Sequence, residues 1–247
     1  MEDKKYITKD YCEVVIIDES PTCYYLRSTV WGYVASMSKD LKIEEWEFYK
    51  LHQGLVSCEN KEELMEIRKS KAYGLWIGIL SRVGRGKYKD VTISSSWCIF
   101  NVFKVFFDKY YKEGFVIDKD LLSEPGKKCY SEKTCTFIPF VLNTAIRECS
   151  VTKNTFKKNK SGEYYFYLSG MCQNLGSKTV KAQSLKDICE KYAIYRCTRV
   201  LTLASLYWHD LTERAREALV KKYDYKNFST TLYEEAQRAE VKVEELR

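Results

Sequence analysis

Val116-Ile-Asp-Lys-Asp120 opens the most informative stretch of this sequence, and Tyr130-Ser-Glu-Lys-Thr-Cys135-Thr-Phe-Ile-Pro139 closes it. The two apolar runs are separated by a loop with a Pro-Gly pair, which predicts two paired strands. Asn143 follows where a helix would begin. Asp118 and Asp120 stand at the end of the first strand. The stretch therefore predicts a hairpin followed by a helix, with two carboxylates at its edge.

These two carboxylates have two interpretations. Carboxylate oxygens are the hard ligands that Mg²⁺ prefers, so Asp118 and Asp120 are candidate metal ligands. Acidic and basic residues at a strand end, before a Pro-Gly loop, are also ordinary turn residues. The two histidines of the chain, His52 and His209, lie outside this stretch. The hairpin therefore contains no histidine that could act as a general base.

The charge of the chain is concentrated in one segment. The formal charge is +7, from 41 Lys and Arg against 34 Asp and Glu in 247 residues. Between Arg147 and Val200 there are 11 Lys and Arg against 4 Asp and Glu, an excess of seven positive charges. A local cluster of basic residues is what the neutralisation of phosphates requires. The alternative interpretation is a basic loop that is only solvated and binds nothing. The basic residues that we predict to contact DNA are Lys153, Lys157, Lys158, Lys160, Lys178, Lys181, Arg196 and Arg199.

Hydrophobic periodicity predicts an α+β fold with several small modules. Apolar alternation over 11–34 predicts strands, and we assign residues 1–57 to a small N-terminal β module. Residues 61–149 form a central domain with helices and the hairpin, in which the aromatics spaced at three to four residues are core. Residues 150–228 hold a three-stranded sheet and a long helix. Residues 229–247 are a charged helical tail.

Three details of the C-terminal module are predicted from local patterns. Ser184, with Asp187 three residues later, is an N-cap for the long helix. Tyr164 to Tyr167 alternate along a strand, so that half of them face the core and half are free to meet DNA. Arg196 and Arg199 are expected to turn away from the apolar face of the helix.

The ten Cys show no repeated C-x-x-C spacing, which favours reduced structural thiols over a zinc or redox motif. The N-terminus lacks the apolar run of a secretory signal, and no apolar run reaches the roughly 20 residues of a membrane span. We therefore expect a protein of the cytoplasm with no membrane partner.

The order Tyr73-x-x-Trp76, Tyr88-Lys-Asp-Val-Thr92, Ile117-Asp-Lys-Asp120 and Phe137-Ile-Pro139 resembles phage-borne proteins of the HNH homing-endonuclease type. Many of these end in a DNA-binding module of the Apetala (ethylene-response-factor) type, and Tyr164 to Tyr192 is similar to a degenerate copy of it. The resemblance implies a bacterial host cytoplasm, double-stranded DNA as the partner and Mg²⁺ as the cofactor of an active site.

The resemblance also implies roles for the hairpin residues. Asp118 and Asp120 would hold Mg²⁺, Lys119 stands about where the general-base His is expected, and Asn143 matches the late polar position. Because the histidines are missing, the site is degenerate. Two functions stay open: a DNA-binding protein with Mg²⁺-dependent endonuclease activity, or an inactive nuclease-derived regulator or anti-defence protein that binds a host protein.

Overall fold

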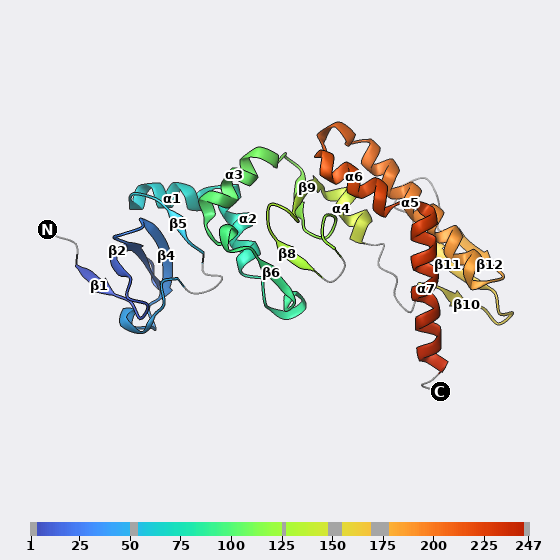
Figure 1. The fold of residues 1–247 in the computed structure, drawn as a ribbon, viewed down its shortest axis with the longest axis horizontal. Helices are drawn as coiled ribbons and strands as arrows, with labels where there is room; N and C mark the ends of the chain where they lie inside the picture. The colour runs from blue at the N-terminus through green and yellow to red at the C-terminus, as the bar shows by residue number, and fades with distance from the viewer. Residues whose placement is uncertain (1–3, 50–53, 125–126, 148–154, 169–177, 245–247) are drawn as a thin grey trace. The chain divides into compact units, whose positions relative to one another are not determined.

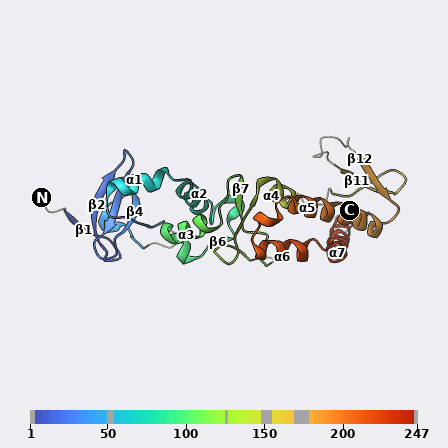
Figure 2. The same cartoon turned by 90° about the horizontal axis from the view of Figure 1, so that it is seen from above.

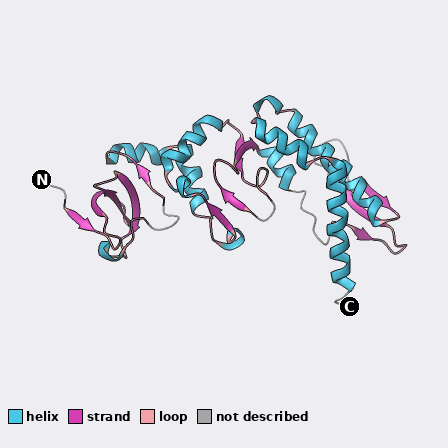
Figure 3. Ribbon diagram, in the orientation of Figure 1, coloured by secondary structure: helices cyan, strands magenta, loops and turns pink. Residues whose placement is uncertain are grey.

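The structure is a computed structural model that describes residues 4–49, 54–124, 127–147, 155–168 and 178–244. The fold is mixed α+β, as predicted, with helices and several small sheets (Figures 1 and 3). The chain forms two compact units. The first comprises residues 1–113 and 119–136, and the second comprises residues 114–118 and 137–247. The division into the four predicted modules stays a prediction.

The first unit begins with a five-stranded antiparallel sheet in sequence order. Its second, third and fourth strands confirm the strands predicted over 11–34, whereas the first and fifth strands were not predicted. Its strands are β1 (Lys5–Ile7), β2 (Glu13–Glu19), β3 (Cys23–Ser28), β4 (Tyr33–Ser38) and β5 (Val56–Ser57). A bulge between Ile16 and Asp18 shifts the register of β2 against β3. Val14, Leu26 and Phe48 have no exposed surface and form the centre of its core. A 3-10 helix, η1 (Ile43–Glu45), lies between β4 and β5.

Helices and a short sheet complete the first unit. The helical segments are α1 (Lys61–Lys69), α2 (Lys71–Leu80), η2 (Gly86–Tyr88), η3 (Ser95–Cys98) and α3 (Phe100–Tyr110). Trp76 donates its indole hydrogen to the carbonyl of Trp97 at 2.7 Å, and both rings are 1 % exposed. The aromatic side chains of η3 and α3 are buried, which confirms the prediction that they are core: Trp97, Phe100, Phe103, Phe106 and Phe107.

The predicted hairpin is present with a different centre and a different helix start. Strand β7 (Phe115–Asp118) pairs with β9 (Thr136–Pro139) as predicted. The intervening segment is more than a loop, because β8 (Lys128–Tyr130) pairs in parallel with β6 (Val91–Ile93). Helix α4 (Phe140–Arg147) starts directly after Pro139. Asn143 therefore lies inside α4, and its prediction as the helix start is wrong, because the turn before the helix is shorter than expected.

The second unit ends in a three-stranded antiparallel sheet with helices packed against it, seen in Figures 1 and 2. The strands are β10 (Lys157–Lys158), β11 (Tyr164–Leu168) and β12 (Lys178–Ala182), in that order. Helix α5 (Leu185–Ser205) packs against β11 and β12, and α7 (Tyr225–Glu244) packs against α5. Between them lie η4 (Trp208–Asp210) and α6 (Glu213–Lys222).

The start of α5 is fixed as the sequence predicts. The hydroxyl oxygen of Ser184 accepts a hydrogen bond from the amide of Asp187 at 3.1 Å, which satisfies one of the free N–H groups of the first turn. Within the described residues, no helix combines the length and the apolar composition that a membrane crossing requires.

Candidate functional site

The three charged residues at the end of β7 lie in contrasting environments. Asp118 is 5 % exposed and Lys119 is 7 % exposed. The side chain of Asp120 is about half exposed. The ammonium group of Lys119 donates to Oδ1 of Asp120 at 2.7 Å. A buried lysine is stabilised when a carboxylate neutralises its charge, so this ion pair accounts for the burial of Lys119.

Tyr130 of β8 completes the surroundings of Lys119. The Lys119 nitrogen lies 5.8 Å from the centre of the Tyr130 ring, within the range of a cation–π contact. Burial of Tyr130 raises the pKa of its hydroxyl to about 12, and the positive charge of Arg82 opposes that shift. The Lys119 carbonyl accepts a hydrogen bond from the hydroxyl of Ser123. Lys119 thus contacts both the loop after β7 and the Tyr130 ring of β8.

These residues do not fit the predicted magnesium site. Mg²⁺ keeps several of its waters in a protein site, and Asp118 has too little exposed surface to receive a hydrated ion. The carboxylate of Asp120 already binds the Lys119 ammonium, which would compete with a divalent cation. In the described ranges, no three His, Cys, Asp or Glu side chains are placed to share a metal ion.

The predicted catalytic residues are divided between the two compact units. Asp118 and Asn143 belong to the second unit, whereas Lys119 and Asp120 belong to the first. In the second unit, Oδ1 of Asn143 is buried without a hydrogen-bond donor among the described residues. The structure brings Lys119 and Asp120 together, and their role in catalysis stays a prediction.

The C-terminal sheet has two different faces. One face packs on α5 through Phe166, which is 2 % exposed, and through Val180 and Ala182. The Phe166 ring lies 5.0 Å from that of Tyr192. Since side chains alternate across a strand, the neighbours Tyr165 and Tyr167 point to the opposite face. The predicted alternation of the tyrosines is confirmed, and Tyr167 is 59 % exposed.

The opposite face combines cationic and aromatic side chains, and we call it the open face. Register places Lys157 and Lys181 on either side of Tyr165. Both lysines are exposed. The Lys157 nitrogen lies 5.5 Å from the centre of the Tyr167 ring, and the rings of Tyr165 and Tyr167 meet edge to face at 5.5 Å. The same alternation puts Thr179, Gln183 and Glu163 on this side.

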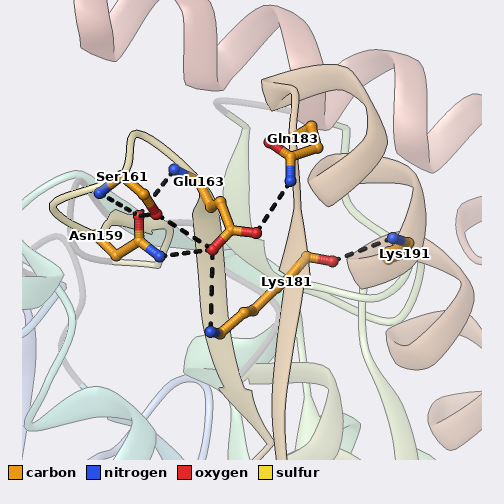
Figure 4. A network of polar contacts seen from close by, with 6 residues as sticks. All are labelled: Asn159, Ser161, Glu163, Lys181, Gln183 and Lys191. Carbon is orange, nitrogen blue, oxygen red and sulfur yellow. Dashed lines mark hydrogen bonds and ion pairs between the residues drawn. The ribbon is translucent and has the colours of Figure 1, made fainter.

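A polar network fixes the turn at the edge of the open face, and Figure 4 shows it. The turn from Asn159 to Gly162 joins β10 to β11, and Gly162 has φ of +82°, a conformation that glycine adopts without strain. The side-chain oxygen of Asn159 accepts from the amides of Ser161 and Glu163, at 3.0 and 2.9 Å. Its side-chain nitrogen donates to Oε2 of Glu163 at 2.8 Å.

Residues of β12 and of the position directly after it contact the Glu163 carboxylate as well. Nε2 of Gln183 donates to Oε1 of Glu163 at 3.0 Å, and the Lys181 nitrogen lies 4.0 Å from Oε2 (Figure 4). The hydrogen bond from Asn159 is the main reason that the pKa of the Glu163 carboxyl is below its ordinary value. Glu163 is therefore ionised at neutral pH, next to a lysine of the open face.

The predicted DNA-binding residues lie in different parts of the structure. Lys157 and Lys181 lie on the open face, and Lys160 is exposed in the adjoining turn. Lys158 is exposed on the edge strand, where its nitrogen lies 4.5 Å from the Tyr164 ring centre. Lys153 and the side chain of Lys178 lie outside the described residues.

The prediction that Arg196 turns away from the core is wrong. Arg196 is 4 % exposed, and its Nη2 donates to the carbonyl of Ala145 in α4 at 3.0 Å. The reason is that α4 covers this side of α5, so the helix is buried on more than one face. Arg199 is half buried. Burial removes Arg196 from the candidate interface and makes it a residue that joins two helices.

Sequence interpretation missed Asn159, Glu163 and Gln183. The signal was present, because Asn159-Lys-Ser-Gly162 between two strands is turn chemistry, with Asn accepting backbone N–H bonds and Gly supplying positive φ. Glu163 also lies two residues before Tyr165, so strand alternation places it on the same face. No protein-family model, no curated protein and no solved structure matches the chain.

Proposed function

We propose that this protein binds double-stranded DNA through the open face of its C-terminal sheet. The observation that carries the proposal is the pairing of Lys157 and Lys181 across Tyr165 on a face whose reverse side packs on α5. Exposed lysines neutralise phosphates and release counterions. Packing of the reverse side by Phe166 gives those lysines a rigid support.

The dimensions of the sheet suit a groove of duplex DNA. Strands in a sheet are spaced by about 4.8 Å, so three strands span roughly 10 Å. The major groove of B-DNA is about 12 Å wide and admits β-structure. Lysines on the outer strands would then meet the two phosphate backbones, while the tyrosines between them would face the groove.

The test is the affinity of the purified protein for a short duplex, measured by fluorescence anisotropy over a range of salt concentrations. Wild-type affinity is expected to fall steeply between about 50 and about 200 mM salt. Replacing Lys157 or Lys181 by alanine is expected to weaken binding about three- to tenfold at low salt, and to reduce the slope against log salt by about 1.

Matched controls remove the same charge from the helices of the same unit. Lys221 in α6 and Lys226 in α7 are both exposed and lie outside the sheet. Lys221→Ala and Lys226→Ala are expected to change the affinity less than twofold, because each removes only a distant charge. Equal losses from the sheet and helix variants would reject the open face as the contact surface.

The alternative function, association with a host protein, gives a different result in the same experiment. A protein partner with an apolar contact would be insensitive to salt, and the wild type would then show no salt-dependent duplex binding. DNA cleavage is a separate prediction of the family resemblance. No contact among the described residues favours it, and a nicking assay tests it below.

A further inference from the structure

Glu163 is an unexpected residue on a surface proposed to meet phosphates. A carboxylate there repels the DNA backbone, and it lies 4.0 Å from the nitrogen of Lys181, one of the two lysines on which that proposal depends. Two hydrogen bonds fix the position of this carboxylate, because Asn159 and Gln183 each donate to one of its oxygens, at 2.8 and 3.0 Å. The carboxylate is thus fixed beside Lys181 from both ends.

Two opposite roles are open to such a carboxylate. It could orient Lys181 toward DNA, which would strengthen binding, or neutralise Lys181, which would weaken it. The side chain of Lys181 is 57 % exposed, and exposed ion pairs fix a lysine only weakly. Orientation therefore contributes little. The negative charge persists in every arrangement of Lys181, since Glu163 is held by neutral donors.

We propose that Glu163 is a restraint on nucleic-acid binding, which neutralises Lys181 and lowers the affinity of the open face for phosphate. This inference rests on the proposed DNA binding through the same face. In this proposal, the hydrogen bonds from Asn159 and Gln183 keep the Glu163 carboxylate beside Lys181 (Figure 4). Removal of the negative charge then frees Lys181 to bind a phosphate. Repulsive elements of this kind reduce binding to poorly matched partners.

The test is a double-mutant cycle on the full chain, with Glu163→Gln, Lys181→Ala and the pair combined, measured with a short duplex at low salt. Glu163→Gln keeps the shape of the side chain and one acceptor oxygen, which can still accept from Asn159, and replaces the oxygen that accepts from Gln183 by an NH2 group. It is expected to tighten binding about two- to fivefold, the effect of freeing an exposed ion-paired lysine. In the Lys181→Ala background the gain is expected to fall below twofold, since the lysine to be freed is gone.

The matched control is Glu190→Gln. Glu190 is exposed on α5, which packs against the reverse side of the sheet, and the variant makes the same charge change. It is expected to change the affinity less than 1.5-fold, because the charge is removed from the helix behind the sheet and not from the surface that meets the phosphates. Thermal unfolding of each variant shows whether the turn remains folded.

The outcomes separate this inference from the proposal beneath it. A gain for Glu163→Gln that exceeds the control and depends on Lys181 supports the restraint. A gain equal to the control, a gain that persists without Lys181, or a loss of affinity in a folded variant overturns the restraint and leaves DNA binding intact. Absence of salt-dependent binding by the wild type overturns both.

Discussion

Lys119 in the first unit and Lys181 in the second both lie beside a carboxylate, but in opposite surroundings. The side chain of Lys119 is 8 % exposed and lies 2.7 Å from Asp120. The side chain of Lys181 is 57 % exposed and lies 4.0 Å from Glu163. Separating a buried ion pair leaves an unpaired charge in a poorly solvated site, which is costly. An exposed cation exchanges one partner for another at little cost.

A charged side chain can bind a partner only where it stays accessible to solvent, so its exposure matters as much as its presence. Lys119 and Asp120 satisfy each other and hold the loop after β7 in place. Lys181 and Lys157 remain in water on a surface whose reverse side is packed.

The largest effect is expected for the packed side of the C-terminal sheet. Phe166 is 2 % exposed and contacts the rings of Phe156 and Tyr192, so Phe166→Ala is expected to cost about 3–5 kcal/mol of unfolding free energy. Tyr167→Ala, one residue later on the open face, is expected to cost no more than about 0.5 kcal/mol. Denaturant unfolding measures both. Similar losses would mean that the two faces are not distinct.

A smaller loss of stability is expected for a buried cation in the same unit. Arg196→Ala removes the hydrogen bond to the Ala145 carbonyl and the buried side-chain stem, which is expected to cost about 2–3 kcal/mol. Duplex affinity of the folded variant is expected to equal that of the wild type, with the same salt slope. A reduced salt slope in the folded variant would restore Arg196 to the DNA interface.

The surroundings of Lys119 are expected to give a pH dependence at the alkaline end. Burial raises the pKa of Tyr130 to about 12, above its ordinary value of 10.0. A group whose folded pKa is raised contributes stability that is fully present below the unfolded pKa and is lost as pH rises through the folded pKa. The first unit is therefore expected to lose stability between about pH 10 and about pH 12.

Tyr130→Phe is the control for that titration. The variant removes the ionisable hydroxyl, so its melting temperature is expected to fall less than that of the wild type between about pH 10 and about pH 12. The comparison corrects for the other tyrosines, which titrate in both proteins. Parallel curves for the two proteins would contradict the burial of an ionisable Tyr130 hydroxyl.

The smallest effect is expected for the predicted nuclease site. Incubation of supercoiled DNA with the protein and Mg²⁺ or Mn²⁺ is expected to give mobility shifts without nicking, because Asp118 is buried and Asp120 is bound to Lys119. Asp118→Ala is expected to shift DNA as the wild type does. Metal-dependent nicking that EDTA and Asp118→Ala both abolish would establish the catalytic assignment of Asp118, Asp120 and Mg²⁺.

Local patterns determined much of the secondary structure. Apolar alternation located β2, β3 and β11, helical spacing of aromatics identified the core of α3, and Ser184 with Asp187 marked the start of α5. These features depend on interactions within a few residues, which is why the sequence alone was sufficient for them. The sequence also located the positive charge excess between Arg147 and Val200.

Tertiary structure decided which charged side chains are available. Lys119 and Arg196 are polar positions in the sequence, yet both are buried, Lys119 next to Tyr130 of β8 and Arg196 against the Ala145 carbonyl of α4. The parallel pairing of β8 with β6 also joins segments that no local pattern connects. Burial depends on the chain segments that pack over a residue, and such long-range contacts leave no local periodicity. The sequence therefore determined where the charges lie, and only the fold decided that Lys157 and Lys181 stay in water while Lys119 and Arg196 become part of the interior.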